Sequence, residues 1–140
     1  MTGAALMVSA IFAFLAQLLL VQRLKLQPEQ FIYLGIVCLF IATVFVGSFN
    51  TFSTLAIGMA FMGTGLGVAM PSISAGASLA VSTDEQGAVA GLVASCPAIG
   101  FVAGPMIAGG LYQVQHSYAS MFSAAVFALL LIVMLVSRRR

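Results

Sequence analysis

Three long stretches of the sequence, residues 1–22, 30–83 and 86–137, contain no Asp, Glu, Lys or Arg. Of all 140 residues, 62% are hydrophobic and 6% are charged, whereas about a quarter of the residues in a soluble domain are charged. Helices formed by these stretches are apolar on nearly every side, so they lack the polar face that a soluble helix presents to water. The bilayer core is the solvent that suits such segments. The sequence therefore predicts an all-α membrane protein.

Five apolar segments are long enough to cross the hydrocarbon core as α-helices. We expect a single transmembrane domain over residues 1–140, with spans at about residues 4–21, 31–49, 55–81, 88–112 and 118–136. The connections between them are short, which favours antiparallel neighbours. The third span contains Pro71 and a glycine-rich run at residues 63–67, which together predict a bend or a tilt.

The basic residues lie on one side of the membrane if the spans alternate in direction. That side carries the first loop and the C-terminus, with Arg23, Lys25, Arg138, Arg139 and Arg140 as expected anchors. By the positive-inside rule this side is cytoplasmic, so we expect a protein of the cell (inner) membrane with its N-terminus outside and its C-terminus in the cytoplasm. An odd number of spans with an outside N-terminus is unusual for a complete protein, and we expect the chain to be a fragment of a transporter with two six-helix halves.

The fourth span combines small residues with two prolines. Gly100, Gly104 and Ala108 recur at steps of four residues, a spacing that lets helix backbones approach closely in lipid. Pro97 and Pro105 each remove a backbone donor and loosen the helix. Close packing against a neighbour is therefore expected, together with a bend that suits an element rocking against a partner. Helix packing without a moving role is the alternative.

Polar and adaptable side chains inside the spans are candidates for contact with a ligand. Ionisable residues within a span commonly handle protons or coupling ions, and this chain has none there. Most of the Gln, Ser and Thr residues, Thr43 among them, are expected to form hydrogen bonds between helices, and most Met and Phe residues to face lipid. The residues that we expect as possible cavity lining are Gln17, Phe61, Met62, Met70, Ser72 and Ser95.

Several classes of site are not expected. The two cysteines and the single histidine lack the spacing of metal ligands, so neither a metal nor another cofactor is predicted. No set of nucleophile, base and orienting group points to an enzyme, and no nucleic-acid partner is expected. Before the fourth span, Ser82 with Glu85 and Thr83 with Gln86 fit a helix capping box.

The stretch GTGLGVAMPSISAGASLAVSTDEQGAVAGLVASCPAIGFVAGPMIAGGLY, residues 63–112, resembles the tenth and eleventh helices of the major facilitator superfamily. It is most similar to the drug/proton antiporters, which include tetracycline-efflux proteins. Their antiporter motif also occurs in the fifth helix, and its final step is two residues where this chain has three. The positions that match it, expected to serve gating or packing, are Gly91, Gly100, Gly104, Pro105, Gly109 and Gly110.

Two features that are absent from the sequence favour a match to the C-terminal half of the family's fold over a match to the N-terminal half. The loop at residues 21–30 lacks the Gly, Asp and Gly-Arg pattern that the family carries between its second and third helices, and the third span contains no arginine. The chain is therefore similar to helices 8–12 of a 12-helix fold.

The resemblance implies alternating access in a secondary active transporter, with efflux of small organic compounds or drugs. Proton coupling would come through a missing N-terminal half, which becomes an expected partner beside the lipid bilayer and a small-molecule substrate. Two alternatives stay open: an intact five-span protein that acts as an interaction or assembly subunit, and a major facilitator for sugars or metabolites.

Overall fold

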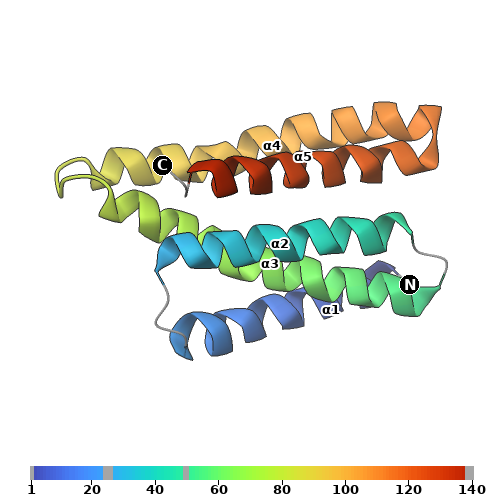
Figure 1. The fold of residues 1–140 in the computed structure, drawn as a ribbon, viewed down its shortest axis with the longest axis horizontal. Helices are drawn as coiled ribbons and strands as arrows, with labels where there is room; N and C mark the ends of the chain where they lie inside the picture. The colour runs from blue at the N-terminus through green and yellow to red at the C-terminus, as the bar shows by residue number, and fades with distance from the viewer. Residues whose placement is uncertain (1, 24–26, 49–50, 138–140) are drawn as a thin grey trace.

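The computed structural model describes residues 2–23, 27–48 and 51–137, and all its regular elements are helices (Figure 1). Of the expected basic anchors, Arg23 is described and exposed, whereas the other four lie outside the described residues. The elements are α1 (Thr2–Leu15), the π-helix η1 (Ala16–Val21), α2 (Pro28–Gly47), α3 (Phe52–Leu79), α4 (Gln86–Val114) and α5 (His116–Ser137).

The five helices expected from the apolar segments are all present. Within the described part of the chain, five helical stretches are long and apolar enough to cross a membrane, at Gly3–Leu20, Pro28–Gly47, Phe52–Leu79, Gln86–Val114 and Tyr118–Ser137. The expected all-α fold is thus confirmed. Helix α3 continues through Pro71 without interruption.

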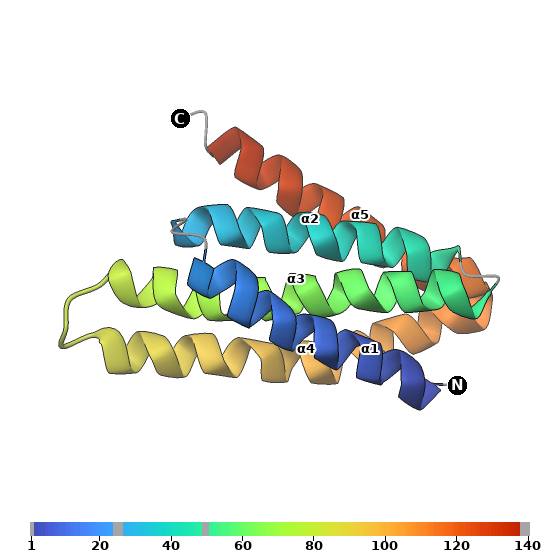
Figure 2. The same cartoon turned by 90° about the horizontal axis from the view of Figure 1, so that it is seen from below.

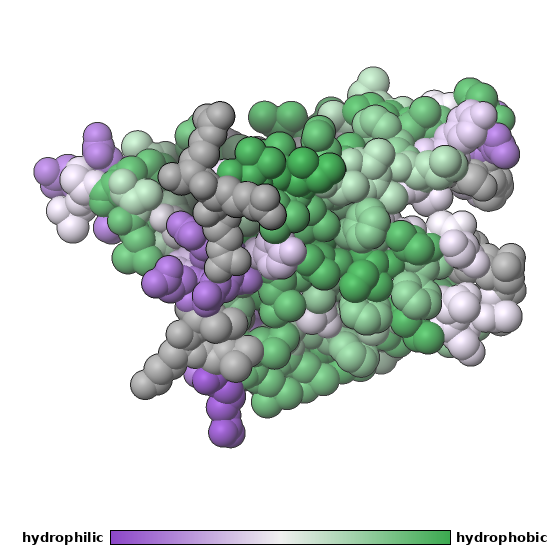
Figure 3. Space-filling model, viewed as in Figure 1, coloured by the Kyte–Doolittle hydropathy of each residue, from purple (hydrophilic) through white to green (hydrophobic). Residues whose placement is uncertain are grey.

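The helices run back and forth between two ends of the molecule (Figure 1). One end, called here the charged end, carries Arg23, Glu29, Asp84 and Glu85, and α5 finishes there at Ser137. Purple hydrophilic residues gather at this end and a green apolar band covers the middle in Figure 3. The opposite end carries the α2–α3 and α4–α5 connections.

Helix α3 lies at the centre of a closely packed group with α1 and α2, and the α4–α5 hairpin lies beside that group. Figure 2 shows α1 crossing α3 obliquely. The hairpin contacts the group mainly through α5 on α2, while α4 contacts α3 less extensively. The described helices therefore pack tightly around α3, whereas α4 makes fewer contacts with the other helices.

Glycines of α3 allow this close packing. A Cβ atom built on Gly63 would overlap the carbonyl oxygen of Ser9 in α1, and one on Gly67 would lie 2.6 Å from the carbonyl oxygen of Ala13. On the other side of α3, a Cβ atom on Gly65 would lie 2.9 Å from the carbonyl oxygen of Gly35 in α2. Such distances leave no room for a side chain, so α3 meets both neighbours backbone to backbone.

Side-chain hydroxyl groups in the helices bond mostly to their own helix. Thr43 donates to the Phe40 carbonyl at 2.7 Å, and Ser72, which is buried, donates to the Val68 carbonyl at 2.7 Å. Ser74 and Ser95 likewise donate to carbonyls four and three residues earlier. The expectation that these four residues bond between helices is wrong, because a Ser or Thr hydroxyl in a helix can donate to a carbonyl of the preceding turn.

The prediction of a capping box before α4 is also wrong. The N-cap of α4 is Glu85, which makes no side-chain cap hydrogen bond. Ser82 instead donates to the Glu85 carboxylate at 3.0 Å, and the Glu85 backbone N–H donates to the Ser82 carbonyl at 3.0 Å. A turn thus forms where the cap was expected. A capping box does form at α3, between Thr51 and Thr54.

Candidate functional site: a cavity beside the glycine-rich helix

A cavity of about 530 Å³ lies among α2, α3, α4 and α5. We call it the four-helix cavity. A notch between the α4–α5 hairpin and the other helices is visible at the end opposite the charged end in Figure 3. The lining residues are Leu39, Ala42, Thr43, Val46 and Gly47 of α2, Met62 and Leu66 of α3, Ala108 and Tyr112 of α4, and Ala119, Ser120, Ser123 and Phe127 of α5.

The cavity extends from the opposite end toward the middle of the membrane-spanning region. Its α2 wall runs from Gly47, the last residue of that helix, back to Leu39. At 1.5 Å per residue this wall is about 12 Å long, close to half of the roughly 30 Å hydrocarbon thickness. The cavity therefore belongs to one leaflet of the bilayer.

The chemistry of the cavity favours an apolar occupant. Most of its lining side chains are aliphatic, aromatic or small. The Thr43 hydroxyl donates to the Phe40 carbonyl at 2.7 Å, and the Ser123 hydroxyl donates to the Ala119 carbonyl at 3.0 Å. These two hydroxyls thus offer the cavity lone pairs but no proton. A site that recognised a polar ligand would need convergent free donors.

The structure brings one of the six expected cavity residues, Met62, to this cavity. Phe61 stacks on Phe45 of α2, with ring centroids 6.2 Å apart. Ser72 is only 5% exposed and bonded to its own helix. The other three residues, Gln17, Met70 and Ser95, are exposed and are not among the residues that line this cavity.

Apart from Met62, the sequence reasoning missed the residues that line this cavity, and those of α5 offered a signal that could have found them. A Cβ atom built on Gly47 would lie 2.6 Å from the Ser120 hydroxyl oxygen, so α2 and α5 meet closely at the rim. Ala119, Ser123 and Phe127 then follow at steps of four residues, on one side of α5. That spacing of small residues at the start of α5 was the available signal.

The glycines of the antiporter-like motif are not packed against another described helix of this chain. A Cβ atom built on Gly91, Gly100, Gly104, Gly109 or Gly110 would meet nothing within 4 Å. No described residue of α4 is buried, and Phe101 is 80% exposed. The close approach expected of α4 is therefore not made with the other described helices, and α3 makes it instead. Small-residue spacing permits close packing without specifying the partner.

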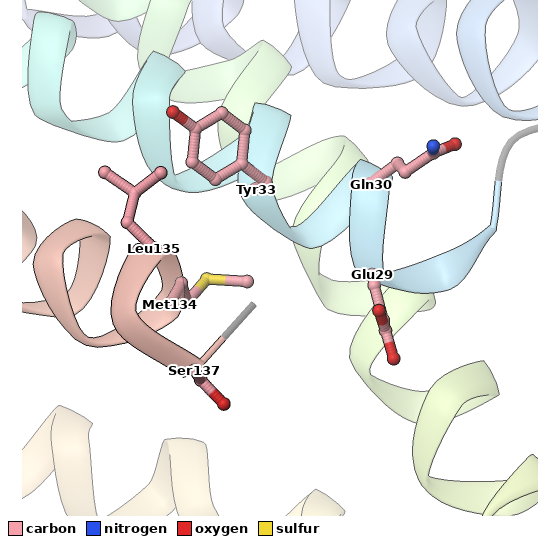
Figure 4. A pocket seen from close by; sticks show the side chains of 6 residues that line it. All are labelled: Glu29, Gln30, Tyr33, Met134, Leu135 and Ser137. Atoms are coloured by element: carbon pink, nitrogen blue, oxygen red, sulfur yellow. The ribbon is translucent and has the colours of Figure 1, made fainter. Parts of the chain in front are cut away.

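A second cavity, of about 430 Å³, lies at the charged end between the start of α2 and the end of α5. It is lined by Glu29, Gln30 and Tyr33 of α2 and by Met134, Leu135 and Ser137 of α5. Figure 4 shows Tyr33 and Leu135 close together, while Glu29 and Gln30 extend in different directions. The polar groups do not converge on one point. Among the described residues, no group of three His, Cys, Asp or Glu side chains could hold a metal ion.

Comparison with known proteins identifies one family. The model of the Major Facilitator Superfamily matches residues 1–140, which is the whole chain. No curated protein and no solved structure matches the sequence. The family assignment thus stands on the family model together with the five membrane-spanning helices.

Proposed function

Because the chain belongs to the major facilitator superfamily, and is thus an integral membrane protein of a transporter family, we propose that it forms part of a drug/proton antiporter. It would export small organic compounds or drugs by alternating access, in which two helical bundles rock around a central site. The chain would supply helices 8–12, and a preceding part of the polypeptide would supply the N-terminal half.

The antiporter-like motif on α4 is the observation that carries this proposal. A Cβ atom on any of its glycines would meet nothing within 4 Å among the described residues, and Pro97 and Pro105 interrupt the backbone hydrogen bonding of that helix. A smooth helix that can bend suits an element that slides against a partner and seals a cavity. These features support a gating role for α4.

Proton coupling is assigned to the part of the transporter outside this chain. None of the three apolar stretches contains Asp, Glu, Lys or Arg, and intramembrane ionisable groups are where protons are usually handled. The N-terminal half would therefore carry the coupling groups, while this chain would contribute walls and moving helices.

The size of the native polypeptide tests the fragment proposal. We expect an antibody against the C-terminal sequence SRRR to detect a band near 40 kDa in source membranes, roughly the size that two six-helix halves require. A band near the 14.5 kDa of these 140 residues would contradict the proposal. It would favour the alternative of a five-span assembly subunit.

Membrane orientation gives a separate prediction. The basic residues of the first loop and of the C-terminus favour a cytoplasmic C-terminus, with the N-terminus of this chain outside. Alkaline phosphatase fused after Arg140 should be inactive and green fluorescent protein at the same position should fluoresce. The same pair of reporters fused within the α4–α5 connection, at Gln115, should give the reverse result. Active phosphatase after Arg140 would overturn the orientation.

A further inference from the structure

The second cavity, at the charged end, combines one charged residue with apolar walls. Glu29 of α2 is the charged residue, while Tyr33 and Met134 supply aromatic and aliphatic surface. The side chain of Gln30 is already engaged, because its oxygen accepts a hydrogen bond from the Gln27 backbone N–H at 3.3 Å within the capping box of α2. Glu29 is therefore the group that a charged partner would recognise.

The Glu29 carboxylate has no described basic residue beside it in the cavity. Arg23, the basic residue that the structure describes, is not among the residues that line the cavity. Glu29 is exposed and lies in the first turn of α2, where a negative charge interacts favourably with the helix dipole. A carboxylate at the mouth of an otherwise apolar cavity is suited to a cation that brings its own apolar surface.

A basic segment of the same chain begins where α5 ends at this cavity. Ser137, the last residue of α5, lines the cavity. Residues 138–140, called here the triple-arginine segment, follow directly in the sequence. Each residue extends a chain by at most about 3.6 Å, so this segment reaches no further than about 11 Å from Ser137. A cation tethered this closely has a high effective concentration at Glu29.

Arginine matches both kinds of surface in the cavity. Its planar guanidinium can donate two hydrogen bonds to one carboxylate and can stack on an aromatic ring such as that of Tyr33. Its aliphatic stem can lie against apolar side chains while the charge stays near water. Figure 4 shows the Met134 side chain directed from α5 toward α2, where such a stem would lie. Polar groups that do not converge disfavour a small polar ligand, but they suit a chain segment that passes along them.

We propose that the second cavity is the docking site of the triple-arginine segment, with at least one of its guanidinium groups paired with Glu29. Figure 2 shows α5 moving away from α2 toward the charged end, so this ion pair ties the two helices together where they diverge. Anionic lipid headgroups are the competing partners of the arginines. Both partners lie within these 140 residues, so the inference does not depend on the proposed transport function.

A zero-length cross-link tests the pairing. Lys25 is the single lysine among these 140 residues. Lys25→Arg, combined in turn with Arg138→Lys, Arg139→Lys or Arg140→Lys, therefore leaves one lysine, within the segment, and keeps every charge. A carbodiimide joins a carboxylate to a lysine amine only where the two are in contact. The polypeptide as the cell makes it would be reconstituted in phosphatidylcholine, with and without phosphatidylglycerol, and its cross-linked peptides would be identified by mass spectrometry.

We expect an amide between Glu29 and the introduced lysine in at least one variant and in both lipid mixtures. It should be several-fold more abundant than any amide with Asp84 or Glu85, the control carboxylates, which lie at the same end between α3 and α4. Raising the ionic strength from about 0.01 M to about 1 M shortens the Debye length from about 30 Å to about 3 Å, so the yield should fall several-fold.

Three results would overturn the docking of the segment. One is the lack of an amide with Glu29 in every variant, or a yield there no higher than at Asp84 and Glu85. Another is a yield that salt leaves unchanged, because contact would then not depend on the ion pair. The third is an amide that forms only without phosphatidylglycerol, since lipid headgroups would then hold the arginines.

Discussion

Replacing Gly63 by leucine should destabilise the 140-residue chain more than any other single glycine substitution in it. A Cβ atom at this position already overlaps the Ser9 carbonyl oxygen, and three further carbon atoms would have to fit into the same contact. Neither backbone can move aside without separating α1 from α3. Overpacking costs about 1–3 kcal/mol and sometimes more, so we expect a loss of about 3 kcal/mol. The midpoint of thermal unfolding should fall by on the order of 10 °C.

The measurement is the fraction of monodisperse protein left after heating in detergent, followed by size-exclusion chromatography. The matched control is Gly100→Leu, which also adds a leucine in the middle of a transmembrane helix, where a Cβ atom would meet nothing within 4 Å. Gly100→Leu should unfold at the wild-type temperature. If Gly63→Leu were equally stable, α1 and α3 would not be packed backbone to backbone.

The number and position of the helices could be predicted from the sequence, because hydropathy acts over some twenty residues at a time and averages out local detail. The third span illustrates this, since the expected 55–81 became Phe52–Leu79. A shift of a few residues at each end follows from caps such as Thr51, which hydropathy does not register.

The partners of individual residues could not be predicted in the same way. Gly63 and Gly104 both lie in glycine-rich apolar segments, yet one meets the Ser9 backbone and the other meets nothing within 4 Å. The difference depends on which helix lies opposite, and small-residue spacing carries no information about that. Thr43 shows the same limit for polar groups, since its bond to the Phe40 carbonyl competes with any bond between helices.

The candidate site was found only in part for a related reason. Met62 lines the four-helix cavity whereas its neighbour Phe61 stacks on Phe45, although both looked equally suited to a ligand. Adjacent residues of a helix point about 100° apart, so the direction of the cavity decides between them. That direction is set by the tilt of the α4–α5 hairpin relative to α2 and α3, which is a property of the assembled helices.

In the longer drug exporter that we propose, replacing Gly104 by leucine, or Pro105 by alanine, should abolish most export while leaving insertion in the membrane intact. Leucine at Gly104 would put a branched side chain on the smooth face of α4, over which a moving partner must slide. Alanine at Pro105 would supply the backbone N–H that can donate to the Phe101 carbonyl, and it would stiffen the helix at this point. We expect export to fall about tenfold or more, which corresponds to at least about 1.4 kcal/mol in the rate-limiting barrier.

The assay is export of a fluorescent drug from cells or vesicles at equal transporter abundance. Val102→Leu is the control, since Val102 is 68% exposed and lies on another side of the same helix, and its export should match the wild type. In the 140-residue chain, Gly104→Leu should leave the unfolding temperature unchanged, because no described atom from another part of the chain lies within 4 Å of the added Cβ. Loss of export without loss of stability would show that these residues act in the movement of α4 and not in the packing of the chain. Wild-type export by both variants would contradict the gating role and leave the α4 glycines as a packing surface alone.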